Sequence, residues 1–266
     1  MTEPFAAWTT RDVIHAHGPD TVTFLQGQLS QDVVALAPGA SAWSLLLDPA
    51  GKVVAWLRAT RVGETELVLD ADAGAGAAIK ARLERFKLRT DCTLDLEEGQ
   101  PALAVRGVDP GEGLPIAWPG VPGRDLLGPS GVAPAGVPLA GAAALEEARV
   151  ATGVPAHGAE LTPDTIPAEA GQWLIDASVS FTKGCYTGQE LIARIDSRGG
   201  HVPRPVRRVT MGGDAVAAVG DEITSGGDVV GHVTSAAGVH ALGPVARKVE
   251  PPADVLVAGR PARVEG

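Results

Sequence analysis

Hydrophobic residues near the start of the chain follow two different periods. Apolar and polar positions alternate over residues 12–18, and after a Gly-Pro-Asp step the apolar positions recur at Val22, Leu25 and Leu29. Side chains alternate between the faces of a strand but return to one face of a helix after three or four residues. The pattern therefore predicts a strand over 12–18 followed by an amphipathic helix.

A β-hairpin is predicted in residues 41–62, where two apolar runs flank Asp48-Pro49-Ala50-Gly51, a sequence typical of a turn. Beyond it, apolar residues at Ile79, Leu83 and Phe86 predict a second helix. Three more short apolar runs predict strands at 65–70, 92–96 and 101–107. This order of strands and helix predicts a small α+β layer.

The second half of the chain is richer in glycine and proline, and its apolar runs are shorter. Residues 107–139 contain eight Gly and seven Pro, which predicts connections and one edge strand. A helix is predicted over 140–153, and a loop-rich stretch follows it. After Pro203 the chain consists of short apolar runs, VRRVTM, DVVGHVTSA and DVLVAGRPARVE, separated by glycine-rich turns. These runs predict a small C-terminal β-barrel or sandwich.

Composition narrows the class of protein. A formal net charge of -10 over 266 residues argues against general binding to nucleic acid or to anionic membranes. The longest apolar runs are too short to cross a bilayer, and the N-terminal residues do not resemble a signal peptide. The chain has two cysteines, and its six histidines show no metal-ligand spacing, so no preformed metal site is expected. We expect a cytoplasmic protein.

Residues 183–190, KGCYTGQE, combine the reactive side chains of a chain that has few of them. A thiolate is the nucleophilic and metal-binding form of cysteine, and the charge of Lys183 would favour it at Cys185 if both side chains face the same way. Gly184 and Gly188 allow unusual backbone angles and close approach of a ligand. A helix beginning near Gly188 would direct its free amides at an anion. The alternative is that Cys185 is a small buried hydrophobic residue and Tyr186 a core ring.

Two further patterns occur in the sequence. Five arginines lie between residues 194 and 208, opposed in that stretch only by Asp196, and they indicate either a solvated surface or a seat for a carboxylate, a phosphate or RNA. The segment GAGAAI at 74–79 lies where a dinucleotide-binding loop would lie, but it lacks the third glycine and a surrounding βαβ series.

The octet resembles the signature of the YgfZ-type folate-binding proteins. These are bacterial relatives of a mitochondrial iron–sulfur assembly factor and belong to the superfamily of the glycine-cleavage T-protein, an aminomethyltransferase. The resemblance extends along most of the chain. It includes FLQGQLSQDV (24–33), LLLDPAGKVVAWLR (45–58), RVATGVPAHGAEL (149–161), IPAEAG (166–171) and VSFTKGCYTGQELIAR (179–194).

The resemblance implies an α+β fold of the T-protein type, a multi-part ring with two α+β parts built on antiparallel sheets and a small C-terminal β-barrel. It implies three regions: residues 1–40 with 141–203 as a discontinuous folate-binding-like domain that carries the octet, 41–140 as a ferredoxin-like domain, and 204–266 as the barrel. The implied ligand is tetrahydrofolate. The implied role is support of iron–sulfur cluster assembly or repair, and of cluster-dependent tRNA modification, with client or assembly proteins as partners.

The family's key functional residue corresponds to Cys185, and the resemblance places Lys183 and Tyr186 with it in the chemistry. The ligand contacts that it implies are Gly184, Gly188, Gln189, Glu190 and Arg194. Ala151 stands where many relatives have an acidic residue able to accept hydrogen bonds from the pterin, so we expect weakened folate recognition, or recognition supplied by Glu160 or Glu169. Arg11 and Leu145 stand where some relatives have tryptophans.

Two other functions remain open at this point. One is a tetrahydrofolate-dependent one-carbon or aminomethyl transferase, and the other is a scaffold that binds a client protein without chemistry.

Overall fold

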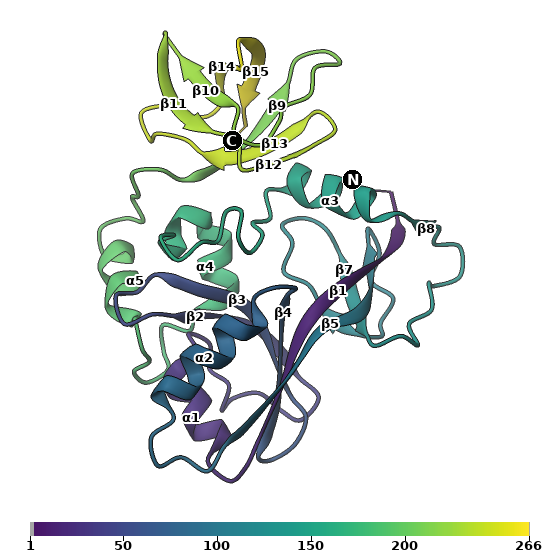
Figure 1. Cartoon of the computed structure of the whole chain (residues 1–266), viewed down its shortest axis with the longest axis vertical. Helices are drawn as coiled ribbons and strands as arrows, with labels where there is room; N and C mark the ends of the chain where they lie inside the picture. Colours follow the sequence, from purple (N-terminus) through teal and green to yellow (C-terminus); the bar gives the residue numbers. More distant parts are fainter. Residues whose placement is uncertain (1–2, 266) are drawn as a thin grey trace.

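A long strand near the N-terminus, β1 (Phe5–His17), organises the larger part of the fold (Figure 1). It pairs antiparallel with a neighbour on each side for most of its length. The computed structural model describes residues 3–265. The sheet contains, in spatial order, β2 (Ser41–Leu47), β3 (Val53–Arg61), β4 (Glu66–Asp72), β1, β5 (Thr93–Arg106), β7 (Gly123–Leu127) and β6 (Leu114–Pro115), and β8 (Leu139–Ala140) pairs with β1.

Helices cover both faces of one half of this sheet. On one face lie α1 (Thr21–Gln28) and α2 (Gly76–Phe86), and on the other lie η1 (Pro167–Ala170), α4 (Gln172–Ser178) and α5 (Gln189–Asp196). Because β2 and β3 are buried on both sides, most of their residues are apolar. This explains the continuous apolar runs of the predicted hairpin.

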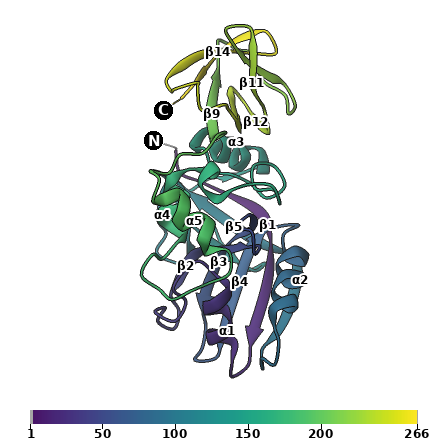
Figure 2. The same ribbon diagram turned by 90° about the vertical axis from the view of Figure 1, so that its left-hand side faces the viewer.

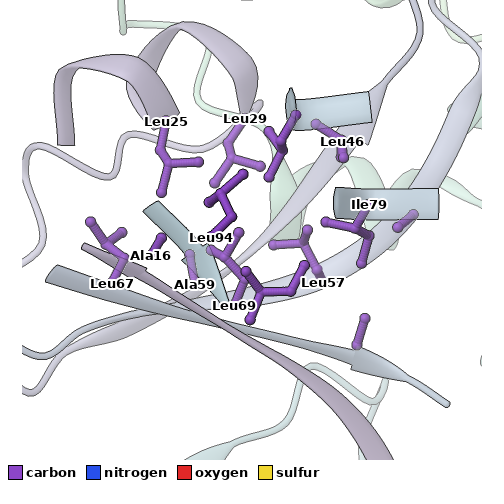
Figure 3. Packing of buried hydrophobic residues seen from close by; sticks show 14 of the residues in the cluster. Ala16, Leu25, Leu29, Leu46, Leu57, Ala59, Leu67, Leu69, Ile79 and Leu94 are labelled. Carbon is purple, nitrogen blue, oxygen red and sulfur yellow. The ribbon is translucent and has the colours of Figure 1, made fainter. Parts of the chain in front are cut away.

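The main core lies between α1, α2 and the sheet (Figure 3). Leu25 and Leu29 come from the α1 segment and Ile79 and Leu83 from α2, and all four are at most 2% exposed. They pack against leucines and alanines of the sheet, including Leu57. The predicted helical spacing therefore identified the buried faces of both helices.

The C-terminal strands form a second, smaller sheet that curls into a barrel at one end of the molecule (Figures 1 and 2). An isolated bridge between Gly231 and Val245 brings the two ends of the sheet together. Its strands are, in spatial order, β11 (Asp228–His232), β10 (Glu222–Ser225), β14 (Ala253–Val257), β15 (Arg260–Val264), β9 (Val206–Met211), β13 (His240–Pro244) and β12 (Ser235–Ala237). The α+β class with a C-terminal barrel is thus confirmed.

The barrel rests on α3 (Ala142–Thr152), which lies between it and the large sheet (Figure 1). Arg149 of this helix donates a hydrogen bond to the hydroxyl of Ser235 in the barrel, at 2.7 Å. Among residues 3–265, no helix is long and apolar enough to cross a membrane.

Some predicted elements were wrong in extent. The strands expected at 92–96 and 101–107 form one strand, β5, because both halves pair with β1 and a bulge accommodates the polar residues between them, where the register shifts between Arg11 and Val13. The run at 228–236 is instead two strands, β11 and β12. The last run, DVLVAGRPARVE, likewise forms two strands, β14 and β15. Residues 107–139, where one edge strand was predicted, contain β7 and the two-residue strands β6 and β8. Strands β10 and β13 were not predicted.

The expected division of the chain into three regions stays a proposal. In the structure, β1 from residues 1–40 lies between β4 and β5 from residues 41–140, so the hydrogen-bonded sheet continues across that boundary.

Candidate functional site

The octet forms the connection between α4 and α5 and packs against the turn of the β2–β3 hairpin. Gly188 precedes α5 and has a φ of +84°. A Cβ at this position would lie 2.6 Å from the carbonyl oxygen of Asp48 and 2.7 Å from Cβ of Leu47. Glycine is therefore required here for its conformation and for its lack of a side chain. Gly184 has open space around it.

Lys183 ties this connection to the end of α1. Its Nζ donates hydrogen bonds to the carbonyl oxygens of Gln26 (2.5 Å), Leu29 (2.6 Å) and Gln31 (3.0 Å). Burial lowers the pKa of Lys183 to about 8. Because an ammonium group has three donors, these three carbonyls use all of them. The structure thus gives Lys183 backbone partners, where the sequence suggested a charge directed at the thiol.

The two cysteines differ in environment. Cys185 is exposed, whereas Cys92 is buried next to α1, and burial raises the pKa of its thiol. The alternative reading of Cys185 as a small buried residue is therefore wrong. In the part of the chain that the structure describes, no three His, Cys, Asp or Glu side chains converge as metal ligands do.

Tyr186, next to the exposed thiol, points into the core. Its ring is buried among residues of β2, β3 and α4, and burial raises the pKa of its phenol to about 12. Its backbone N–H donates to Oε1 of Gln189, at 3.3 Å. The core-ring interpretation of Tyr186 is correct, and Gln189 caps the turn before α5.

Three other residues predicted to contact a ligand do not converge on Cys185. Glu190 and Arg194 lie exposed on α5. Glu169 accepts a hydrogen bond from the backbone N–H of Ile166 at 3.1 Å, and burial raises the pKa of its carboxyl group.

Glu160 is fully engaged by its surroundings. Its carboxylate accepts hydrogen bonds from the hydroxyls of Thr234 and Ser235, from Arg149 at 3.3 Å and from the N–H of Ala156 at 3.0 Å. It joins the barrel to the segment after α3. The suggestion that Glu160 replaces an acidic pterin ligand is therefore not supported, because its oxygens already have partners.

A separate cavity of about 410 Å³ lies between the large sheet and α3. Its volume falls within the range of roughly 300–1,000 Å³ that is usual for small-molecule sites. The aromatic part of its lining is Trp43, Trp56 and Trp118, with Trp43 and Trp56 stacked at 4.1 Å between ring centroids. Arg11 and Leu145, which stand at the family's tryptophan positions, both line this cavity.

A buried network of charges lies beside the cavity, and Arg11, Arg106 and Asp125 of this network line it. Asp70 accepts hydrogen bonds from Arg11 (2.6 Å) and from two nitrogens of Arg58 (2.8 and 2.9 Å). Asp125 contacts Arg58 at 3.2 Å and Arg106 at 2.9 Å. Opposite charges at these distances keep the pKa of Asp125 below its usual range, even though its burial acts in the other direction.

The octet and the cavity are distinct places in the fold. No octet residue lines the cavity. On β2, Leu47 contacts Gly188 while Trp43 lines the cavity, and four residues of strand span about 13 Å. The sequence located the octet, and two positions aligned by the resemblance, Arg11 and Leu145, line the cavity, but the buried charge network beside it was not predicted. Its available signal was the presence of Arg58 and Asp70 inside otherwise apolar strands.

Comparisons with known proteins agree with this architecture. The chain is 30% identical to an uncharacterised protein of Haemophilus influenzae over 201 residues, which is 73% of this chain and 69% of that protein. It is 28% identical to the "tRNA-modifying protein YgfZ" of Pectobacterium carotovorum over 213 residues, 68% of this chain and 63% of that protein. The chain belongs to the YgfZ-type family.

The chain also matches a eukaryotic relative and a solved structure with other names. It is 30% identical to a mitochondrial iron–sulfur cluster assembly factor homolog of Phaeosphaeria nodorum over 71% of its own length, but that match spans only about half (51%) of the fungal protein. The crystal structure of the glycine cleavage system aminomethyltransferase T from Bartonella henselae has the same fold, with a TM-score of 0.77 over 98% of this chain and 85% of that one, at 22% identity. No family model matches the chain.

Proposed function

We propose that this chain supports iron–sulfur proteins, including those that modify tRNA, and that it acts through Cys185. The names of its relatives, a tRNA-modifying protein and an iron–sulfur cluster assembly factor, support the general role. The observation that supports the residue is the contrast between the two thiols, one exposed on a tightly anchored connection and the other buried.

The contacts that hold the residues on either side of Cys185 in place suit a thiol that binds another protein. Lys183 fastens one side of Cys185 to α1, and Tyr186 fastens the other side to the core. A rigid, exposed thiol loses little freedom when it binds a partner. One thiolate supplies one ligand to iron or carries one sulfur atom, so the other ligands would come from the partner, a second copy or a small thiol. Exposed Arg194 and Arg198 on and after α5 would attract an acidic partner.

We also propose that the cavity takes a reduced folate, and that it does so weakly. The cavity's volume and its tryptophans suit a ligand with flat rings. Ala151 does not line the cavity and has no carboxylate to receive the donors of a pterin. A folate there would be bound and oriented by the tryptophans and by the charged wall.

The test is complementation of a strain that lacks this gene, with wild type, Cys185→Ser and the matched control Cys92→Ser. We expect wild type and Cys92→Ser to restore aconitase-type activity and Cys185→Ser to fail, with glycine-cleavage flux unchanged in all strains. Restoration by Cys185→Ser would remove the thiol from the mechanism. A selective loss of glycine cleavage in the deletion strain would instead favour an aminomethyl transferase, for which the shared fold is the supporting observation.

A further inference from the structure

The hydroxyl of Ser30, just after α1, joins three segments of the chain. It donates a hydrogen bond to the carbonyl oxygen of Ser178, at 2.7 Å, and accepts one from the backbone N–H of Leu45, at 2.8 Å. The hydroxyl of Ser44 lies 3.3 Å away and completes the hydrogen bonding of this oxygen. Because Ser30 is 0% exposed, its hydroxyl depends on these protein partners.

The backbone of Ser30 makes the same two connections. Its N–H donates to the carbonyl oxygen of Leu45, at 3.0 Å, and its carbonyl oxygen accepts the N–H of Ser180, also at 3.0 Å. Leu45 belongs to β2, which pairs with β3 in the large sheet. Ser178 is the last residue of α4, and Ser180 lies in the connection, residues 179–188, that carries the octet to α5. Ser30 therefore fastens the start of this connection to the sheet.

The carbonyl oxygens on either side of Ser30 hold the next part of the connection. Those of Leu29 and Gln31 accept hydrogen bonds from Nζ of Lys183, at 2.6 and 3.0 Å. Three successive carbonyls after α1 therefore have partners in the connection. The ammonium group keeps its acceptors only while these carbonyls stay in place, and their place depends on the attachment of Ser30 to β2. The lysine anchor thus depends on the serine.

Cys185 lies between this anchor and a second one. Two residues beyond it, the N–H of Thr187 donates to the carbonyl oxygen of Gly27, at 3.1 Å, and the octet then packs against the β2–β3 turn. The thiol is exposed, so the contacts of the residues on its two sides set its position. The first set of those contacts is organised by Ser30.

We propose that Ser30 is a positioning residue of the candidate site: its hydroxyl holds residues 178–183 on β2 and thereby fixes the place and direction of the Cys185 thiol. Loss of this hydroxyl would leave the carbonyl of Ser178 and the N–H of Leu45 buried without this partner, which favours local opening of the connection. The consequence for activity rests on the proposed function, whereas the positioning itself does not.

The test is the mobility of a nitroxide spin label on Cys185, measured by electron paramagnetic resonance. In a Cys92→Ser background Cys185 is the only cysteine, so the spectrum reports on this position alone. We expect Ser30→Ala to add a mobile component to the spectrum. Hydrogen exchange of the N–H of Ser180 should become at least about tenfold faster in the same variant. A serine that only contributed to global stability would leave the spectrum of the folded protein unchanged.

The matched control is Ser235→Ala in the barrel. This serine is also buried, and its hydroxyl donates to Glu160 and accepts from Arg149, both at 2.7 Å. The same substitution therefore removes one donor and one acceptor from a buried site, but neither partner belongs to the octet or its connection. We expect this control to lose stability and to keep the wild-type spectrum. If Ser30→Ala has the wild-type spectrum, or if both variants show the mobile component, the inference is overturned.

A measurement on the wild type keeps the inference testable if Ser30→Ala does not fold. The N–H groups of Leu45 and Ser180 both bond to Ser30, so opening of this serine exposes both. Their exchange rates, each relative to the unfolded chain, should agree within about tenfold. A larger difference, with Ser180 the faster, would show that the connection opens independently of Ser30 and would overturn the inference.

Failure of the inference and failure of the proposed function give different results. If Cys185→Ser restores the cluster enzymes, the proposed function fails, and the spin label still decides whether Ser30 positions the connection. If Cys185→Ser does not restore them and Ser30→Ala has the wild-type spectrum, the inference fails and the proposed function stands.

Discussion

Replacing Gly188 with alanine should destabilise the protein by about 2–5 kcal/mol. Its φ of +84° places an alanine in the left-handed region, which costs roughly 1–2 kcal/mol. The new Cβ would also lie 2.6 Å from a backbone oxygen of Asp48, and relieving such overpacking costs roughly 1–3 kcal/mol. Because the close neighbours include backbone of the β2–β3 turn, they cannot rotate away. Against a usual domain stability of roughly 5–15 kcal/mol, this is a large loss.

Urea unfolding followed by tryptophan fluorescence measures this change, and the chain provides a matched control. Gly39 has nearly the same conformation, with a φ of +82°, but nothing lies within 4 Å of the position its Cβ would occupy. Gly39→Ala should therefore cost only the conformational part, roughly 1–2 kcal/mol. If the two alanine variants lose the same stability, the close approach of the octet to the hairpin contributes nothing and the reasoning is refuted.

Three more predictions follow from burial. Substoichiometric iodoacetamide at neutral pH should label Cys185 well before Cys92, because only the first is exposed, and peptide mapping that finds equal labelling would contradict this. Tyr186 is the only tyrosine, so absorbance at 295 nm should show it ionising near pH 12 in the folded protein and near 10 in denaturant; since the unfolded state loses its proton first, stability should fall as pH rises from about 10 to 12. Glu160→Gln should cost about 1–3 kcal/mol in urea unfolding because it weakens the hydrogen bonds that the buried carboxylate accepts while Arg149 keeps its pair with Glu146, whereas the exposed Glu190→Gln should change stability by less than about 0.5 kcal/mol.

The octet was recognisable from sequence because its chemistry is local. Eight consecutive residues carry the thiol, the lysine and the glycines, and the helix that follows them was predicted from the same stretch. The sequence did not determine which way the side chains of Lys183 and Tyr186 point. Lys183 donates to backbone carbonyls of residues 26–31, in the last turn of α1 and just after it. Tyr186 packs into the core against β2 and β3.

The first two helices were likewise predicted from the period of apolar residues, and the hairpin and the C-terminal strands from short apolar runs between turn residues, all of which depend on neighbours a few positions away. The extent of β5 was decided by its pairing with β1, about eighty residues earlier, which extends the strand through polar residues that no local pattern assigns to a strand. Tertiary structure also decided the cavity. Arg11, Arg58, Asp70 and Asp125 lie on four different strands, and only the order of those strands in the sheet brings their charges together in a buried network. The physical reason is that burial and charge pairing are properties of neighbours in space, which the sequence alone does not specify.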